Sequence, residues 1–137
     1  MKKILIALLL SLIIISGCTK RVDNYNLTSV EVIEKMEAKE SFLLYFTSKS
    51  CSACIEFTPV YEDVRKDYGE YMFALDIAEE NAEHPEELTK LLVEYTGNVM
   101  VTPTTLVIVD GEVEQSFLGI LKFSELENAI KNYKLVK

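Results

Sequence analysis

The stretch SFLLYFTSKSCSACIEFTPVY, residues 41–61, joins a predicted strand to a predicted helix through two cysteines. Its apolar run, residues 42–46, is typical of a central strand that is covered on both faces. Apolar residues then recur at helical spacing from Phe57 onward. Cys51 and Cys54 therefore lie at the start of a helix, just after the chain leaves a buried strand.

This placement gives the two cysteines different chemistry. Cysteines three residues apart on a helix share a face, with side chains about 5–6 Å apart, which is close to the separation that a disulfide requires. The first lies where free backbone N–H groups and the helix dipole favour a thiolate. We therefore expect Cys51 to attack a substrate disulfide and Cys54, one turn deeper, to resolve the mixed disulfide.

Two other uses of the pair are open. A zinc site would need two more ligands, and the only other His or Cys residues are His84 and Cys18. A purely structural disulfide is the second alternative, but so short a loop restricts the unfolded chain little. A redox function of the pair needs no metal and no cofactor, because the two sulfurs carry the electrons.

The N-terminal segment has the pattern of an export signal. Two lysines precede an apolar run, residues 4–15, that is broken only by Ser11 and is short for the roughly 20 residues of a spanning helix. The tetrad Ile15-Ser16-Gly17-Cys18 then resembles the lipobox of bacterial lipoprotein signal peptides. This resemblance implies that the chain is cut before Cys18.

In that class Cys18 becomes the acylated first residue and the membrane anchor, on the extracytoplasmic face of the cell membrane. We therefore expect a signal peptide at residues 1–17, a polar tether at 18–26 and one domain at 27–137. An uncleaved anchor helix and an ordinary secretory signal are the alternatives.

Length and charge limit the classes of function. A chain of 137 residues fits one such domain. Hydrophobic residues make up 49% of it, which excludes wholesale disorder. The net charge of −8 argues against nucleic acid as a partner, because phosphates bind Lys and Arg.

The remaining pattern alternates helices and strands. We expect a first helix that is capped at Thr28 or Ser29, with Val30, Ile33 and Met36 on its apolar face. The acidic segment 79–87 is expected to be a solvated surface loop that leads into a helix. Further strands are predicted at 71–77, 104–109 and 113–118, with a hairpin turn at Asp110-Gly111 and helices over 88–95 and after a cap at Ser124.

This order predicts an α/β fold in which parallel strands have helices on both faces and the hairpin adds an antiparallel edge. From about Tyr25 to the C-terminus the chain also resembles the thioredoxin superfamily. The resemblance rests on Cys51-Ser52-Ala53-Cys54, Pro59, Asp76, Thr102-Pro103-Thr104 and Gly119. It implies a thioredoxin-like fold with a central mixed β-sheet flanked by helices. It also implies a cis bond before Pro103, beside the cysteines, and backbone pairing of Thr102 with the substrate.

The departures from the family pattern are specific. Ser50 stands where many members have tryptophan, and Ser52-Ala53 replaces the Gly-Pro of reductive thioredoxins. Tyr45 stands in the place of a buried aspartate that helps to deprotonate the second cysteine, so Glu56 or water is left for that task. The segment 79–101 is longer than in small thioredoxins.

Together these features predict an extracytoplasmic thiol–disulfide oxidoreductase that acts on secreted or surface proteins, with a membrane redox partner as a further expectation. The subgroup that it resembles most is the thioredoxin-like lipoproteins and bacteriocin-accessory proteins. A peptide-binding module without redox activity and an accessory factor for one secreted substrate are the alternatives. The direction of electron flow is open, with a modest preference for making or reshuffling disulfides.

Overall fold

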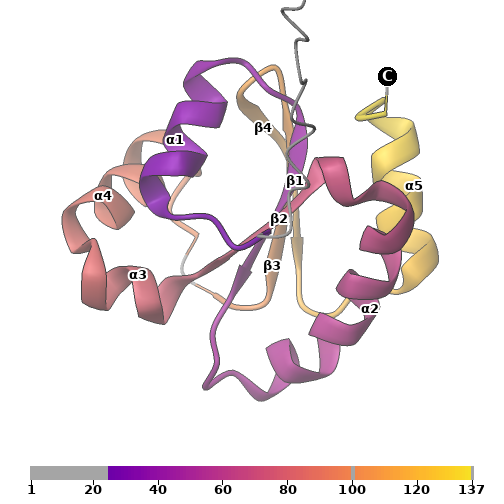
Figure 1. Ribbon diagram of the computed structural model, residues 1–137, viewed down its shortest axis with the longest axis horizontal. Helices are drawn as coiled ribbons and strands as arrows, with labels where there is room; N and C mark the ends of the chain where they lie inside the picture. Colours follow the sequence, from indigo (N-terminus) through magenta and orange to yellow (C-terminus); the bar gives the residue numbers. More distant parts are fainter. Residues whose placement is uncertain (1–24, 100, 137) are drawn as a thin grey trace, which may run out of the picture.

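The computed structural model describes residues 25–99 and 101–136, and over these the chain forms a four-stranded sheet with helices on both faces (Figure 1). The strand order is β2-β1-β3-β4. The elements are α1 (Ser29–Glu37), β1 (Phe42–Thr47), α2 (Ser52–Tyr68), η1 (Gly69–Tyr71), β2 (Met72–Asp76), α3 (Ile77–Glu83), α4 (Pro85–Lys90), η2 (Leu91–Tyr95), β3 (Thr104–Val109), β4 (Glu112–Leu118) and α5 (Phe123–Asn132).

The sheet lies between two helical layers, as Figure 1 shows, with α2 and α5 on one side and α1, α3 and α4 on the other. Side chains of β1 alternate between the two faces. Leu43 and Tyr45 pack with α2 and α5, whereas Leu44 and Phe46 pack with α1, α4 and η2. The continuous apolar run of β1 is therefore explained by burial on both faces, as the sequence predicted.

The direction of β3 differs from the parallel arrangement that was predicted. β2 runs parallel to β1, but β3 is antiparallel to β1, and β4 is antiparallel to β3. Asp76, where β2 ends, pairs with Thr47, and Thr104, where β3 begins, pairs with Phe46. The chain between them thus leaves and re-enters the sheet at the same end. The connection consists of α3, α4 and η2. It therefore differs from the single crossover helix that would join two parallel strands.

The acidic segment 79–87 is mostly helical, not a loop, and one of its carboxylates is buried. Asp76 caps α3 by accepting hydrogen bonds from the N–H groups of Ala78 (2.9 Å) and Glu79 (3.1 Å). Glu80 is only 5% exposed, and its Oε2 accepts a hydrogen bond from the N–H of Ser29 at 2.7 Å. The solvated face that was predicted is therefore wrong at Glu80, because this carboxylate satisfies the N-terminus of α1.

Two smaller expectations, one about a helix face and one about a helix cap, are also wrong. In α1, Val30 is 41% exposed and Val32 takes the buried place beside Ile33 and Met36. In α5, the N-cap is Lys122 in place of Ser124, because Glu125 closes the helix end by accepting a hydrogen bond from the N–H of Lys122 at 2.7 Å.

The hairpin and the start of the domain complete the frame. Asp110 and Gly111 both have positive φ, 50° and 80°, which confirms the predicted tight turn. Tyr25 and Asn26, assigned to the tether by sequence, pair with Ala74 on the edge of β2.

The predicted signal peptide, Cys18 and the rest of the tether lie outside the described residues. Among the residues that are described, no helix is long and apolar enough to cross a membrane.

Candidate functional site

The two cysteines are joined by a disulfide at the N-terminus of α2, where the sequence placed them. Cys51 is the N-cap residue, and its Sγ lies 3.2 Å from the backbone N of Cys54. The two Cα atoms are 5.2 Å apart. The helix N-terminus therefore directs a backbone N–H at the first sulfur, which favours negative charge on it when the bond is reduced.

The surroundings of the two sulfurs differ. Cys51 is half-buried at the end of the β1–α2 loop. Cys54 is 1% exposed and belongs to the core cluster between the sheet and α2, which also includes Tyr45 and Phe57. A large substrate can therefore approach the sulfur of Cys51 but not that of Cys54.

A loop far away in sequence completes the site. The bond between Thr102 and Pro103 is cis, as the resemblance implied. The carbonyl oxygen of Thr102 lies 3.5 Å from the Sγ of Cys51. Gly119, at the end of β4, has a φ of 86° and donates its N–H to the carbonyl of Pro103 at 2.8 Å. The antiparallel β3–β4 pair thus holds the Pro103 loop against the cysteines.

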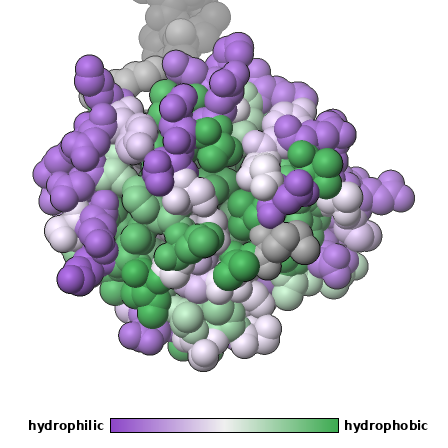
Figure 2. All heavy atoms as spheres, turned by 180° about the vertical axis from the view of Figure 1, so that it is seen from behind, coloured by the Kyte–Doolittle hydropathy of each residue, from purple (hydrophilic) through white to green (hydrophobic). Residues whose placement is uncertain are grey.

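Apolar surface gathers near this end of the molecule. Figure 2, seen from behind, shows apolar side chains over the lower and central part of the face, with hydrophilic residues crowded along its upper part. The lower end is the one where α2 begins in Figure 1. Exposed apolar residues of the adjoining elements are Ile55, Val101, Leu118 and Ile120.

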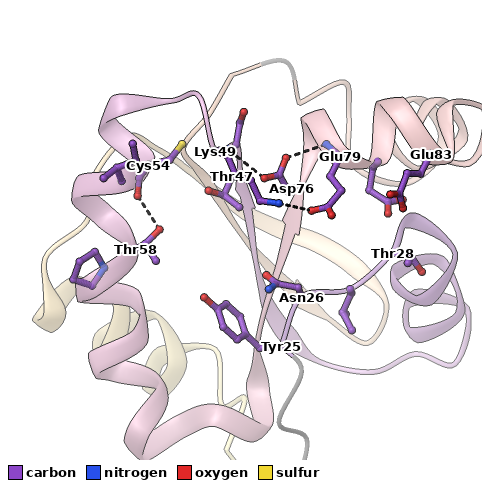
Figure 3. A pocket seen from close by; sticks show the side chains of 15 residues that line it. Tyr25, Asn26, Thr28, Thr47, Lys49, Cys54, Thr58, Asp76, Glu79 and Glu83 are labelled. Carbon is purple, nitrogen blue, oxygen red and sulfur yellow. Dashed lines mark hydrogen bonds and ion pairs between the residues drawn. The ribbon is translucent and has the colours of Figure 1, made fainter.

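A cavity of about 790 Å³, lined mostly by polar residues, lies on the other side of the β1–α2 loop, where Cys54 forms part of its wall (Figure 3). Thr58 and Asp76 also line it, as do Tyr25 and the exposed ion pair between Lys49 and Glu79 at 3.2 Å. Sequence reasoning missed this cavity, since its walls come from α2, α3 and the Tyr25–Thr28 segment, which no local pattern brings together.

Tyr45 has a structural role and not the deprotonating role of the aspartate in whose place it stands. Its hydroxyl donates a hydrogen bond to the carbonyl oxygen of Cys54 at 3.2 Å, and Thr58 Oγ1 donates to the same oxygen at 2.8 Å. Both hydroxyls thus hold the first turn of α2 in place. Pro59, inside α2, lacks the N–H that would bond to the carbonyl of Ile55.

Glu56 is exposed and lies two positions from Cys54. Residues two apart on a helix do not face each other, so this carboxylate points away from the second sulfur. Cys54, by contrast, forms part of the wall of the cavity.

Tyr25 forms part of the cavity wall and is tied to α2. Its hydroxyl donates to Glu62 Oε1 at 2.9 Å, and the guanidinium of Arg65 lies 4.0 Å from its ring centre. Burial, followed by the hydrogen bond to Glu62, raises the pKa of Tyr25 to about 12. The phenol therefore stays neutral over the whole physiological range.

His84 lies between α3 and α4 and is half-buried. Among the described residues, its side chain makes no hydrogen bond with either cysteine. Within residues 25–99 and 101–136, no group of three or more His, Cys, Asp or Glu side chains could hold a metal ion.

Comparison with known proteins agrees with this geometry. Solved structures that are similar to the chain include a thioredoxin of Plasmodium falciparum, with 23% identity, a TM-score of 0.59 and coverage of 79% of this chain and 97% of that one. Mitochondrial thioredoxin 3 of Saccharomyces cerevisiae, in its oxidised form, has 19% identity and a TM-score of 0.57, with 80% and 94% covered. A mutant thioredoxin of Halobacterium salinarum has 19% identity and a TM-score of 0.62, with 80% and 89% covered.

No curated protein sequence matches the chain. The sequence pattern of the thioredoxin family, by contrast, matches residues 23–132, which is most of its length. Thus the chain belongs to the thioredoxin family, and its disulfide-forming Cys51–Cys54 pair makes it a thiol–disulfide oxidoreductase.

Proposed function

We propose that this oxidoreductase is lipid-anchored and works outside the cytoplasm, with Cys51 as the attacking residue and Cys54 as the resolving residue. The observation that carries the division of roles is the unequal burial of the two joined sulfurs. Cys51 is half-buried at the helix N-terminus, whereas Cys54 is 1% exposed. Thiol–disulfide exchange needs an accessible thiolate, and only Cys51 combines access with a nearby backbone N–H.

The proposed reaction runs through one mixed disulfide. The Cys51 thiolate attacks a substrate disulfide, a bond forms between Cys51 and one substrate sulfur, and the other substrate sulfur leaves as a thiolate. Cys54 then loses its proton and attacks the Sγ of Cys51, which re-forms the Cys51–Cys54 bond and releases the second substrate thiolate. Two electrons pass from the protein to the substrate, and the reverse sequence makes a disulfide in the substrate.

Thr102 and Pro103 are proposed to position the substrate chain. The contact between the Thr102 carbonyl and the Sγ of Cys51 supports this, because a substrate bonded to that sulfur must pass the same loop. The exposed apolar residues around it suit polypeptide substrates, which would be secreted or surface proteins. For the proton of Cys54, the cavity supports water over Glu56.

The anchor is proposed from the sequence of residues 1–18, with Cys18 as the lipid attachment site. A membrane protein that exchanges electrons with Cys51 would be the natural redox partner. We favour the making or reshuffling of disulfides, because a Cys51–Cys54 disulfide persists where no cytosolic reductant reaches. Acid quench and thiol labelling of cells report the direction: a pair found mostly reduced at steady state would contradict the oxidase assignment.

Two cysteine substitutions test the proposal as a pair. Cys18→Ala should lose fatty-acid label and membrane fractionation while the extracted protein keeps its rate of disulfide exchange. Cys51→Ala should keep the label and lose the exchange. Equal labelling of wild type and Cys18→Ala would refute the anchor. Exchange that survives Cys51→Ala would refute the catalytic role of Cys51, whereas a wild-type protein without exchange above background would favour a binding module.

A further inference from the structure

A second, more apolar hollow lies on the Cys51 side of the β1–α2 loop. Its volume is about 400 Å³, which is within the range of about 300–1,000 Å³ that is typical of ligand pockets. A cavity of roughly 150 Å³ already holds a benzene ring, so a large apolar side chain fits. The lining residues are Ser48, Ile77, Ala78, Asn81, Leu88, Leu92, Val99 and Thr102.

The floor of this hollow is an extension of the core. Ile77, Leu92 and Val99 are partly buried and pack against the cluster that α1, α4 and η2 form with the sheet, and Leu88 belongs to that cluster. All four come from the segment 77–99, which folds as α3, α4 and η2 beside the site (Figure 1). The polar lining is confined to Ser48, Asn81 and Thr102.

The rim of the hollow contacts Cys51 through two residues, one at its sulfur and one at its backbone N–H. The carbonyl of Thr102 lies 3.5 Å from Cys51 Sγ, and the carbonyl of Ser48 accepts the N–H of Cys51 at 3.1 Å. A substrate sulfur bonded to Cys51 lies about 2 Å from its Sγ. Since an extended chain advances about 3.3 Å per residue, side chains one or two residues from the substrate cysteine reach the hollow.

We infer that this hollow is a specificity subsite that takes an apolar side chain, one or two residues from the reacting cysteine of a polypeptide substrate. The inference rests on the proposed function, because the mixed disulfide is what brings the substrate chain to the rim. Burial of the apolar side chain adds to the binding of the transition state, so substrates that carry it exchange faster than substrates with a polar residue there.

Symmetric peptide dimers provide the test, since attack on either sulfur then releases the same peptide. Each peptide has one cysteine, and Leu or Asn is placed at one of the two positions before or after it. The full-length protein in its dithiol form is mixed with each oxidised dimer, and the second-order rate constant of a single turnover is measured. At one of these positions, Leu should be preferred over Asn by about 10-fold or more.

Two substitutions fill the hollow from its exposed wall, and one serves as a matched control. Ala78→Leu and Asn81→Leu should each bring the Leu-to-Asn ratio close to one. Ala82 is exposed on the same helix and does not line the hollow, so Ala82→Leu should keep the ratio of the wild type. A wild-type ratio near one at every position, or a ratio that survives both filling substitutions, would overturn the subsite. Absence of exchange with any dimer would instead overturn the proposed function.

Discussion

The two sides of the β1–α2 loop differ in burial and in the character of the surrounding residues, although one disulfide joins them. On the Cys51 side the sulfur is partly accessible, apolar residues are exposed, and the Thr102–Pro103 loop lies against it. On the Cys54 side the residue is 1% exposed and forms part of the wall of a cavity that is lined mostly by polar residues. Cys51 and Cys54 are three residues apart in sequence, so their different chemistry comes from what the fold packs around each of them.

The face of α2 that carries Cys54 should be the more sensitive one to truncation. Phe57 is fully buried and packs edge-on against Tyr45 at 5.0 Å between ring centres. Phe57→Ala should lower the free energy of unfolding by about 3–5 kcal/mol. Ile55, on the same helix, is 64% exposed, so Ile55→Ala should change it by about 0.5 kcal/mol or less. Urea unfolding of both variants checks this, and equal losses would remove the distinction between the two faces.

Alkylation distinguishes the sulfurs directly. In the reduced protein, Cys51 should react with a brief pulse of iodoacetamide at least about 10-fold faster than Cys54, and at lower pH, because it is more accessible and lies at the helix N-terminus. Mass-spectrometric mapping of the modified peptides measures the ratio. Preferential modification of Cys54 would reverse the assignment of roles.

Tyr45 gives a smaller, structural test of the Cys54 side. Tyr45→Phe removes the hydrogen bond to the Cys54 carbonyl and should lower the free energy of unfolding by about 1 kcal/mol. Tyr71 is half-buried, and its hydroxyl makes no hydrogen bond with other side chains that the structure describes, so Tyr71→Phe is a matched control with a smaller loss. A larger loss in the control would show that the bond does not stabilise this turn.

Tyr25, in the wall of the cavity, predicts that the stability of the protein falls modestly with rising pH in the alkaline range. The pKa of Tyr25 is raised from 10.0 to about 12, chiefly by burial. A raised pKa contributes stability that is fully present below pH 10 and is lost as pH rises through about 12. Tyr25→Phe should therefore reduce the fall in urea midpoint between pH 9.5 and 11.5. A fall as steep as that of the wild type would mean that Tyr25 ionises as freely in the folded protein as in the unfolded chain.

Local pattern was enough to predict the parts of the site that one segment forms. The strand at 42–47, the cysteines at a helix N-terminus and the Asp110-Gly111 turn follow from apolar runs, spacing and turn chemistry. The cis bond at Pro103 was predicted only through resemblance, because most X-Pro bonds in folded proteins are trans.

Features that depend on two distant segments were missed. Glu80 is buried because it meets the N–H of Ser29, 51 residues away. The direction of β3 follows from the end of the sheet at which the chain returns after α3, α4 and η2. Both hollows beside the disulfide are walled by several elements, so no periodicity in the sequence could indicate them.

The division of labour between the two sulfurs is tested most directly by trapping the mixed disulfide. With a disulfide-linked peptide dimer, reduced Cys54→Ser should form a lasting bond between peptide and Cys51, seen as one added peptide mass that maps to that residue. Reduced Cys51→Ser should form no adduct on the same time scale. An adduct that forms on Cys54 in Cys51→Ser as fast as the one on Cys51 in Cys54→Ser would contradict the assignment.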